Sequence, residues 1–318
     1  MFGKYNSVAI RGIETIVPRT IIDNREYAGQ IGERKVSKQI KFTGIESCHV
    51  TDSSETTETM CTEAAKQLLA RLEWQREDIQ GLILVTQTPS CRMPATAFRI
   101  HRELELEEDC IVFDVNMGCS GYTTGLTIAG GLLSPLPPGS KMLLLVGDTM
   151  TKCLGEHDTQ TKMMFGDAGT ATGLEALPDN RLFYMQKSSG KGCDAIYMKN
   201  QADFFHMDGM RVFRYTINEV LEYIKEFKEK TGICENDIDF YVFHQAQKHI
   251  LDNIADFCGI DREKLLISYE TYGNTSGASI PVTLTANCEK LCPGKNRVLM
   301  CGFGVGLSCG IVYGEVTV

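Results

Sequence analysis

The chain has 318 residues, of which 43% are hydrophobic, and this is enough to form one large core or two joined lobes. Its net charge is −9 and the sequence has no basic cluster, which argues against a nucleic acid as a partner. It has no apolar run of about 18 residues, and its N-terminus lacks the apolar core of a signal peptide, so we expect no membrane span and no export.

The cysteine content indicates the compartment. Thirteen cysteines in a chain without an export signal are typical of a reducing environment, so we expect a cytoplasmic protein. Cys288 and Cys292 have the spacing CxxxC, but no second pair of ligands follows them. We therefore expect most cysteines to be small buried hydrophobic residues, and we predict no metal site.

The sequence contains an internal repeat. The first copy reads EDIQGLILVTQTP, CIVFDVNMGCSGYTTGL and KMLLLVGDT; the second reads NDIDFYVFHQAQ, KLLISYETYGNTSGASI and RVLMCGFGVG. Its apolar strands lack polar alternation, which is typical of a parallel sheet covered on both faces; they are Leu82–Val85, Leu143–Val146, Phe240–Phe243 and Val298–Met300. We predict an α/β protein with two halves, residues 1–175 and 176–318, because turn signals lie between Glu175 and Lys191.

Cys119 is the most informative residue of the first half. It follows the apolar run Cys110–Val115, and it precedes a stretch of small and apolar residues, Tyr122–Leu133, that predicts a buried helix. A cysteine at such a strand-to-helix turn lies near the helix N-terminus, where backbone N–H groups and the helix dipole favour the thiolate. An ordinary thiol has a pKa of about 8.5, and we expect the helix N-terminus to lower the pKa of Cys119 below this value. We predict that Cys119 is a nucleophile that carries a covalent intermediate.

The second half supplies partners for this cysteine. His244 follows a strand, and ligands of open parallel sheets bind beyond the carboxyl ends of the strands. The repeat aligns Asn274 with Cys119, so we expect the two equivalent turns to meet. A histidine and an asparagine can both donate to an oxygen that becomes negatively charged. The glycines of Gly302–Gly306 would let the backbone approach the reacting centre and add an N–H group to an oxyanion hole.

These motifs resemble the β-ketoacyl-acyl-carrier-protein synthase III family over nearly the whole chain: DVNMGCSGYTTG, FGDAGTA, FHQAQ, YGNTSGAS and GFGVGLSCG. The resemblance implies a thiolase-like fold of two pseudo-repeated halves in five layers (α-β-α-β-α), working as a homodimer. It implies that Cys119 takes an acyl group from acyl-ACP or acyl-coenzyme A. His244 and Asn274 would then promote the decarboxylative Claisen condensation with malonyl-ACP, with Cys119 and Val305 N–H groups as the oxyanion hole and no permanently bound cofactor.

The chain departs from the family where coenzyme A binds. In well-known members a tryptophan and an arginine stack on the adenine, and Lys38 and Thr159 stand near those positions here. We therefore expect coenzyme A thioesters to be poor donors and an acyl-carrier protein to serve both steps. The only tryptophan, Trp74, is predicted to lie on a surface helix.

The resemblance also implies positions for substrate contacts. Docking of the acyl-carrier protein falls to Arg211, Arg214 and Lys248. Met93, Met163 and Phe205 would line the acyl pocket, and Met164 is a further candidate. Met93 would reach across the dimer into the pocket of the neighbouring subunit.

Two other functions are open. A relative of this family could transfer the acyl group from Cys119 to an alcohol or amine, but Asn274 argues against this because attack by a hydroxyl calls for a base. A silent partner subunit of a condensing heterodimer would need no nucleophile, whereas this chain has Cys119, His244 and Asn274 together. The sequence does not predict the acyl chain or the pathway.

Overall fold

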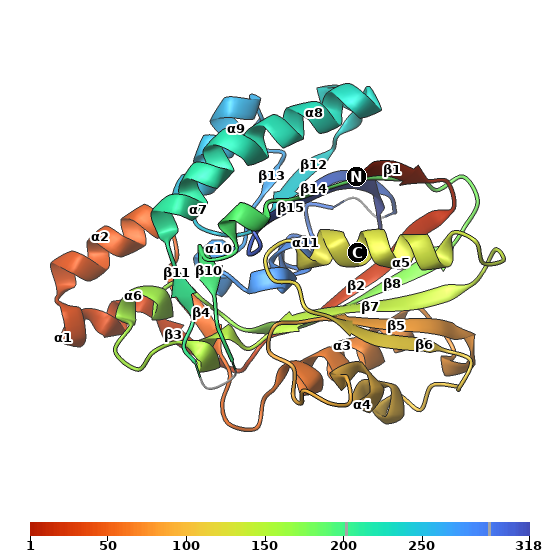
Figure 1. Ribbon diagram of the computed structural model, residues 1–318, viewed down its shortest axis with the longest axis horizontal. Helices are drawn as coiled ribbons and strands as arrows, with labels where there is room; N and C mark the ends of the chain where they lie inside the picture. Colours follow the sequence, from red (N-terminus) through yellow and green to blue (C-terminus); the bar gives the residue numbers. More distant parts are fainter. Residues whose placement is uncertain (201–202, 292–293) are drawn as a thin grey trace.

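The computed structural model describes residues 1–200, 203–291 and 294–318. Helices and sheets alternate in five layers: outer helices, a sheet, central helices, a second sheet and further outer helices (Figure 1). Within the described ranges, no helix is long and apolar enough to cross a membrane.

The lower sheet in Figure 1 comes mainly from the first half of the chain. In spatial order its strands are β2 (Val8–Ile16), β8 (Ala168–Ala176), β7 (Lys141–Asp148), β5 (Ile79–Val85) and β6 (Ile111–Val115). Helices α3 (Thr57–Arg71) and α4 (Thr96–Glu103) cover its outer face. Strand β5 runs parallel to β6 and β7, whereas β8 is antiparallel to β7 and β2.

The upper sheet repeats this arrangement. Its strands are β9 (Leu182–Ser188), β15 (Ser308–Val316), β14 (Asn296–Gly304), β12 (Phe240–Phe243) and β13 (Leu265–Leu266), and β1 (Phe2–Tyr5) pairs with β9. Helices α8 (Leu221–Thr231) and α9 (Lys248–Cys258) cover it. Strand β12 is parallel to β13 and β14, and β15 is antiparallel to β14 and β9. The predicted repeat is therefore confirmed, and a single residue pair, Val316 and Ile10, joins the two sheets.

Short elements complete the chain. They are β3 (Thr20–Asp23), α1 (Ala28–Ile31), α2 (Glu33–Thr43), β4 (Ser47–Val50), α6 (Thr159–Lys162), β10 (Ile196–Tyr197), β11 (His206–Met207), α7 (Gly209–Tyr215) and α10 (Tyr269–Tyr272). A π-helical turn over Thr216–Val220 joins α7 to α8. The chain passes from the lower to the upper sheet between Ala176 and Leu182, and the division into halves at residue 175 stays a prediction.

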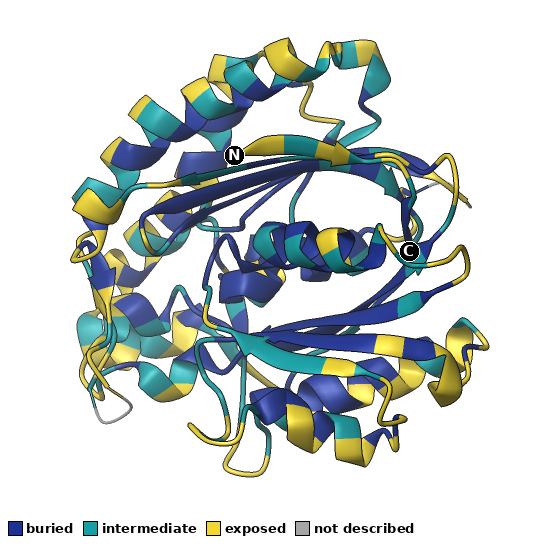
Figure 2. Ribbon diagram, turned by 45° about the vertical axis from the view of Figure 1, so that its right-hand side comes forward, coloured by how far each residue is buried: buried dark blue, intermediate teal, exposed yellow. Residues whose placement is uncertain are grey.

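The central layer consists of α5 (Gly121–Leu133) and α11 (Ser279–Ala286), which lie between the sheets (Figures 1 and 2). Neither helix contains a charged residue. A helix that is apolar on all sides is typical of a fully packed environment, and most residues of both helices are buried. The predicted buried helix after Cys119 is thus confirmed.

The turns that precede these two helices touch each other. A Cβ atom on Gly277 would lie 2.9 Å from the carbonyl oxygen of Gly118, which is shorter than real Cβ contacts allow. The predicted meeting of the two equivalent turns is therefore confirmed. Because glycine has no side chain, the two halves can approach closely enough to share one site.

Trp74 differs from the prediction, because it does not lie on a surface helix. Helix α3 ends at Arg71, and Glu73 has a left-handed φ of 54°, which turns the chain away from the helix. Trp74 is only 9% exposed and packs in the hydrophobic cluster between α3, α4 and the lower sheet. Lys141 lies over its ring, with the ammonium 5.4 Å from the ring centre.

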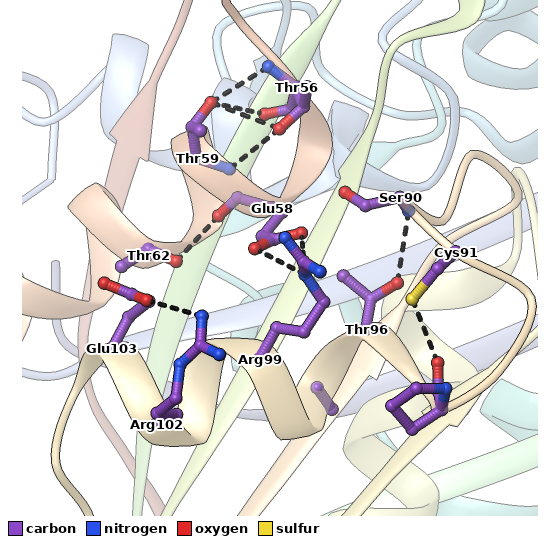
Figure 3. A network of polar contacts seen from close by, with 12 residues as sticks. Thr56, Glu58, Thr59, Thr62, Ser90, Cys91, Thr96, Arg99, Arg102 and Glu103 are labelled. Atoms are coloured by element: carbon purple, nitrogen blue, oxygen red, sulfur yellow. Dashed lines mark hydrogen bonds and ion pairs between the residues drawn. The ribbon is translucent and has the colours of Figure 1, made fainter.

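Polar contacts hold the segment from Ser90 to Thr96, which carries Met93 (Figure 3). The Ser90 N–H donates to Thr96 Oγ1 at 3.1 Å, and Cys91 Sγ lies 3.1 Å from the carbonyl oxygen of Pro94. Beside it, the Arg99 guanidinium of α4 donates to both carboxylate oxygens of Glu58 on α3. The Met93 side chain is 87% exposed in the single chain.

We expect Gly277→Ala to destabilise the protein, because its methyl group must push against the Gly118 carbonyl. Overpacking of this kind lowers the free energy of unfolding by about 1–3 kcal/mol. The matched control is Gly29→Ala, where a Cβ meets no atom within 4 Å and the helix α1 gains a better helix former. Thermal unfolding followed by circular dichroism should show a lower Tm for Gly277→Ala only; equal Tm values would contradict the close contact.

Candidate active site

One cavity brings together the side chains that the sequence singled out. Its walls include Cys119 from the lower half and His244, Asn274 and Val305 from the upper half. Apolar side chains complete the lining, among them Met150, Met164, Phe165, Ile196, Phe205, Val212, Ile250 and Phe303. The cavity therefore combines a few convergent polar groups with an apolar wall, as small-molecule sites generally do.

Cys119 lies at the start of α5, where the Gly121 N–H donates to the Gly118 carbonyl in a tight turn. The glycine-rich segment approaches it as expected: a Cβ on Gly304 would lie 2.8 Å from Cys119 Sγ, and Gly304 has a φ of 149°. Ser308 ties the same segment to the nucleophile turn. Its Oγ donates to the Val305 carbonyl at 2.6 Å and lies 2.7 Å from Ser120 Oγ.

The expected lowering of the Cys119 pKa is wrong for the unliganded site. Burial raises the pKa of this thiol to about 11, and the buried carboxylate of Asp148 acts in the same direction. The backbone N–H groups of Val305 and of Cys119 itself oppose the shift but do not cancel it. The free-energy cost of removing a thiolate from water is larger than its stabilisation by the backbone N–H groups at the helix N-terminus. Cys119 is therefore a neutral thiol at pH 7.

His244 is buried and directly follows β12. Its backbone N–H donates to the Cys301 carbonyl at 2.9 Å, and its Nδ1 lies 2.7 Å from Ser279 Oγ. The edge of the imidazole meets the face of Phe303, with ring centres 5.7 Å apart. Burial lowers the pKa of His244 to about 4, although a backbone contact with Ser276 opposes the shift. The imidazole is therefore neutral at pH 7.

Asn274 is fixed on three sides. Its N–H donates to the Met164 carbonyl at 2.8 Å, and its own carbonyl accepts from the Gly166 N–H at 3.1 Å. The side-chain oxygen Oδ1 accepts from the Ser276 N–H at 2.9 Å. Because Oδ1 is engaged, the amide group Nδ2 is left as a donor toward the cavity that Asn274 lines.

Sequence reasoning missed Asp148, which supports this site from β7. Its Oδ1 accepts from the Gln87 N–H at 2.7 Å and from the Thr86 and Thr88 hydroxyls at 3.0 and 3.2 Å. Burial raises the pKa of Asp148, and these donors oppose the shift. A signal was present, because a carboxylate only two residues after the apolar run Leu143–Val146 has to find partners inside the protein.

A surface groove adjoins the cavity and shares Met164 and Gln247 with it. Lys38 and Thr159, near the family's adenine-binding positions, both line this groove, together with Lys35. Phe42 also lines it and is 53% exposed, so the groove offers one aromatic face that sequence reasoning did not find.

The predicted pocket and docking residues take separate places. Phe205 lines the cavity, whereas Met163 is fully buried and its neighbour Met164 occupies the wall. Met93 lies on the surface, outside the cavity lining of its own chain.

On the outer surface, Arg211 and Arg214 line a depression beside α7. Arg211 pairs with Asp194 at 2.7 Å, and Arg214 is exposed. Lys248 begins α9 next to the groove residue Gln247 and pairs with Asp252 at 2.6 Å.

The raised pKa predicts a pH dependence for alkylation of Cys119. Below a pKa of about 11, the thiolate fraction grows about tenfold with each pH unit. We expect the iodoacetamide reaction at Cys119, followed by mass spectrometry of its peptide, to accelerate continuously from about pH 7 to about pH 10. The exposed Cys234 in the same digest reports the reagent. A rate at Cys119 that levels off below about pH 9 would contradict the assignment.

Known proteins match this sequence and this fold. Residues 113–190 match the family described as 3-oxoacyl-[acyl-carrier-protein (ACP)] synthase III, and residues 229–315 match its C-terminal part. The chain is 32% identical over 310 residues to a β-ketoacyl-[acyl-carrier-protein] synthase III of Streptococcus pneumoniae, covering 92% of this chain and 94% of the relative.

Solved structures agree with the sequence relatives. A 3-oxoacyl-(acyl-carrier protein) synthase from Burkholderia xenovorans LB400 superposes with a TM-score of 0.96 at 30% identity, covering 99% of this chain and 96% of the other. The 3-oxoacyl-[acyl-carrier-protein] synthase III from Aquifex aeolicus VF5 has a TM-score of 0.89 at 25% identity, covering 97% and 99%. The predicted thiolase-like fold is confirmed, and the chain belongs to the β-ketoacyl-acyl-carrier-protein synthase III family of condensing acyltransferases.

Proposed function

We propose that this enzyme loads an acyl group onto Cys119 and condenses it with malonyl-ACP to give a 3-ketoacyl thioester and CO2. One observation carries the proposal: a buried thiol and two neutral hydrogen-bond donors, His244 and Asn274, line one cavity. Each donor is held from behind, His244 by Ser279 and Asn274 by the Ser276 N–H. The family supports the same reaction.

In the first step, Cys119 Sγ attacks the carbonyl carbon of the donor thioester. A new C–S bond forms, the donor's C–S bond breaks, and the proton of Cys119 leaves on the departing thiol. The N–H groups of Cys119 and Val305, which both act on the sulfur in the resting site, would bind the oxyanion of the tetrahedral intermediate.

In the second step, the malonyl group loses CO2 and its thioester becomes an enolate. A neutral imidazole can donate from Nε2 when Nδ1 accepts, and the Ser279 hydroxyl at 2.7 Å is the donor that Nδ1 needs. Asn274 Nδ2 supplies the second donor to the enolate oxygen. The enolate carbon then attacks the acyl-cysteine, and Cys119 leaves as a thiolate that takes up a proton.

An acyl-carrier protein is the proposed partner in both steps. The groove has Lys35 and Lys38 where a phosphopantetheine phosphate would pass, and Phe42 as its only aromatic residue among the described lining. Since the chain has a net charge of −9, an acidic carrier needs a local basic surface, and Arg211, Arg214 and Lys191 supply one beside α7.

The proposed assembly is a homodimer. Strand β6 is the free edge of the lower sheet, and its Ile111 is 46% exposed; on α4, which packs against β6, Phe98 is 53% exposed. An apolar edge strand of this kind requires a cover. The exposed Met93 would then be available to the acyl pocket of the second copy. The twelve cysteines that the structure describes are all free, which supports a reducing compartment such as the cytoplasm.

Cys119→Ala should abolish acyl loading. Intact-protein mass spectrometry should show an adduct on the wild type and on the control Cys234→Ala, but not on Cys119→Ala. Malonyl-ACP should then discharge the adduct with release of CO2. An adduct that persists with malonyl-ACP but passes to an alcohol or amine would support ester or amide formation instead, and no adduct with any donor would support a silent subunit.

His244→Ala and Asn274→Ala should separate the two steps. Both side chains act on the enolate, so we expect loading of Cys119 within about threefold of wild type and condensation slowed by about 100-fold or more. Single-turnover assays with pre-acylated enzyme measure the second step directly. Normal condensation by either variant would remove that residue from the mechanism.

Arg214→Glu should weaken use of the carrier protein. Replacing an exposed cation by an anion repels an acidic partner, so the KM for malonyl-ACP should rise by about tenfold or more, with little change for a malonyl N-acetylcysteamine thioester. Arg181→Glu, exposed between β8 and β9, makes the same charge change elsewhere. Equal losses with both substrates, or equal effects of both variants, would argue against docking at Arg214.

A further inference from the structure

A second cavity adjoins the reaction cavity. It shares five lining residues with the reaction cavity: Gln87, Met150, Ile196, Phe205 and Val305. The groove shares only Met164 and Gln247 with the reaction cavity, and it shares no described residue with the second cavity. If the thioester arm enters by the groove, as the proposed function requires, the acyl group on Cys119 extends into the second cavity.

Two side-chain amides lie in this second cavity, on Gln87 and Asn116. Gln87 reaches the nucleophile turn itself, because a Cβ on Gly118 would overlap its Oε1. Its Nε2 donates to Asn116 Oδ1 over a long 3.4 Å. Within the described part of the single chain, no other hydrogen bond engages the two amide groups, so Gln87 Oε1 and Asn116 Nδ2 have no partner there other than a ligand.

The Gln87 amide stands on a rigid base. The backbone N–H of Gln87 donates to the buried carboxylate of Asp148 at 2.7 Å, and the hydroxyls of Thr86 and Thr88 on either side donate to the same oxygen. A side chain whose backbone is fixed in this way loses little conformational entropy when it binds a ligand. A mobile amide on the surface would lose more.

The remaining lining identifies the ligand as neutral. The other side chains are those of Met150, Ile196, Tyr197, Met198, Phe205 and Val305, so the described lining contains no lysine, arginine or histidine. A carboxylate on the acyl group would have no cation to pair with, and Asp148 lies beneath the same loop. A purely hydrocarbon chain would cover two amides without satisfying them. A hydroxyl group can both donate and accept between them.

We propose that Gln87 and Asn116 form a polar acyl subsite that selects a short acyl group bearing a neutral hydroxyl. This inference rests on the proposed function, since it needs an acyl group on Cys119. A site built to hydrogen-bond a substrate rejects the analogue that lacks the polar group far more strongly than an apolar pocket separates two hydrocarbons. Gln87 contacts the group nearer to Cys119, and Asn116 contacts it nearer to the surface.

The test compares two donors of the same shape, the N-acetylcysteamine thioesters of 3-hydroxybutyrate and isovalerate, in which a hydroxyl replaces a methyl. Initial rates of Cys119 acylation are read by intact-protein mass spectrometry. We expect wild type to load 3-hydroxybutyryl at least about tenfold faster. Gln87→Met and Asn116→Leu should each reduce this ratio to less than about threefold. The control Gln67→Met, exposed on α3, should keep it.

The possible outcomes distinguish a failure of the polar subsite from a failure of the proposed function. Equal loading of both donors by wild type overturns the polar subsite and leaves the proposed function intact. Fastest loading of a succinyl thioester overturns the neutral assignment in favour of an anion. A ratio that survives in both variants moves selectivity away from these amides; because Asn116 is exposed, its variant keeps the test valid even if Gln87→Met unfolds. No acylation by any thioester overturns the proposed function and the subsite together.

Discussion

The contact between the two halves at Gly118 and Gly277 is the constraint on which the site depends. Each half supplies a strand, a turn and a buried helix, and the cavity is lined by side chains from both halves. Only the absence of side chains at this contact lets the nucleophile turn and the Asn274 turn share one cavity. The same holds for Gly304 in the glycine-rich segment Gly302–Gly306, because a methyl group on Gly304 would touch Cys119 Sγ.

The electrostatic state of the cavity follows from this tight packing. Both the thiol of Cys119 and the imidazole of His244 are neutral at pH 7, because burial moves their pKa values in opposite directions, to about 11 and about 4. In the proposed condensation, a permanently charged imidazole would also pair with the malonyl carboxylate and so oppose its loss as CO2. A neutral imidazole avoids this and can still donate a hydrogen bond to the enolate while it exists. In the resting site, Cys119 and His244 therefore carry no charge at pH 7.

Much of this arrangement could be predicted from the sequence, for identifiable reasons. The repeat predicted the equivalence of the Cys119 and Asn274 turns, and apolar strands without alternation predicted the two covered sheets. Trp74 was misplaced because the helical pattern continues past Arg71, and only the left-handed backbone of Glu73 ends it. Which of Met163 and Met164 faces the cavity could not be predicted, since adjacent residues of a short helix-to-strand turn point in different directions. The Cys119 pKa depends on burial, which is a property of the whole fold.

The groove and the second cavity each share lining residues with the reaction cavity, and this has a consequence for the order of events in the proposed reaction. Among the described residues, the groove shares only Met164 and Gln247 with the reaction cavity, and under the proposed function both thioester arms would use this one groove. In the proposed reaction the first carrier would then leave before the second binds, while the acyl group stays on Cys119. We therefore expect discharged carrier to compete with malonyl-ACP for this groove.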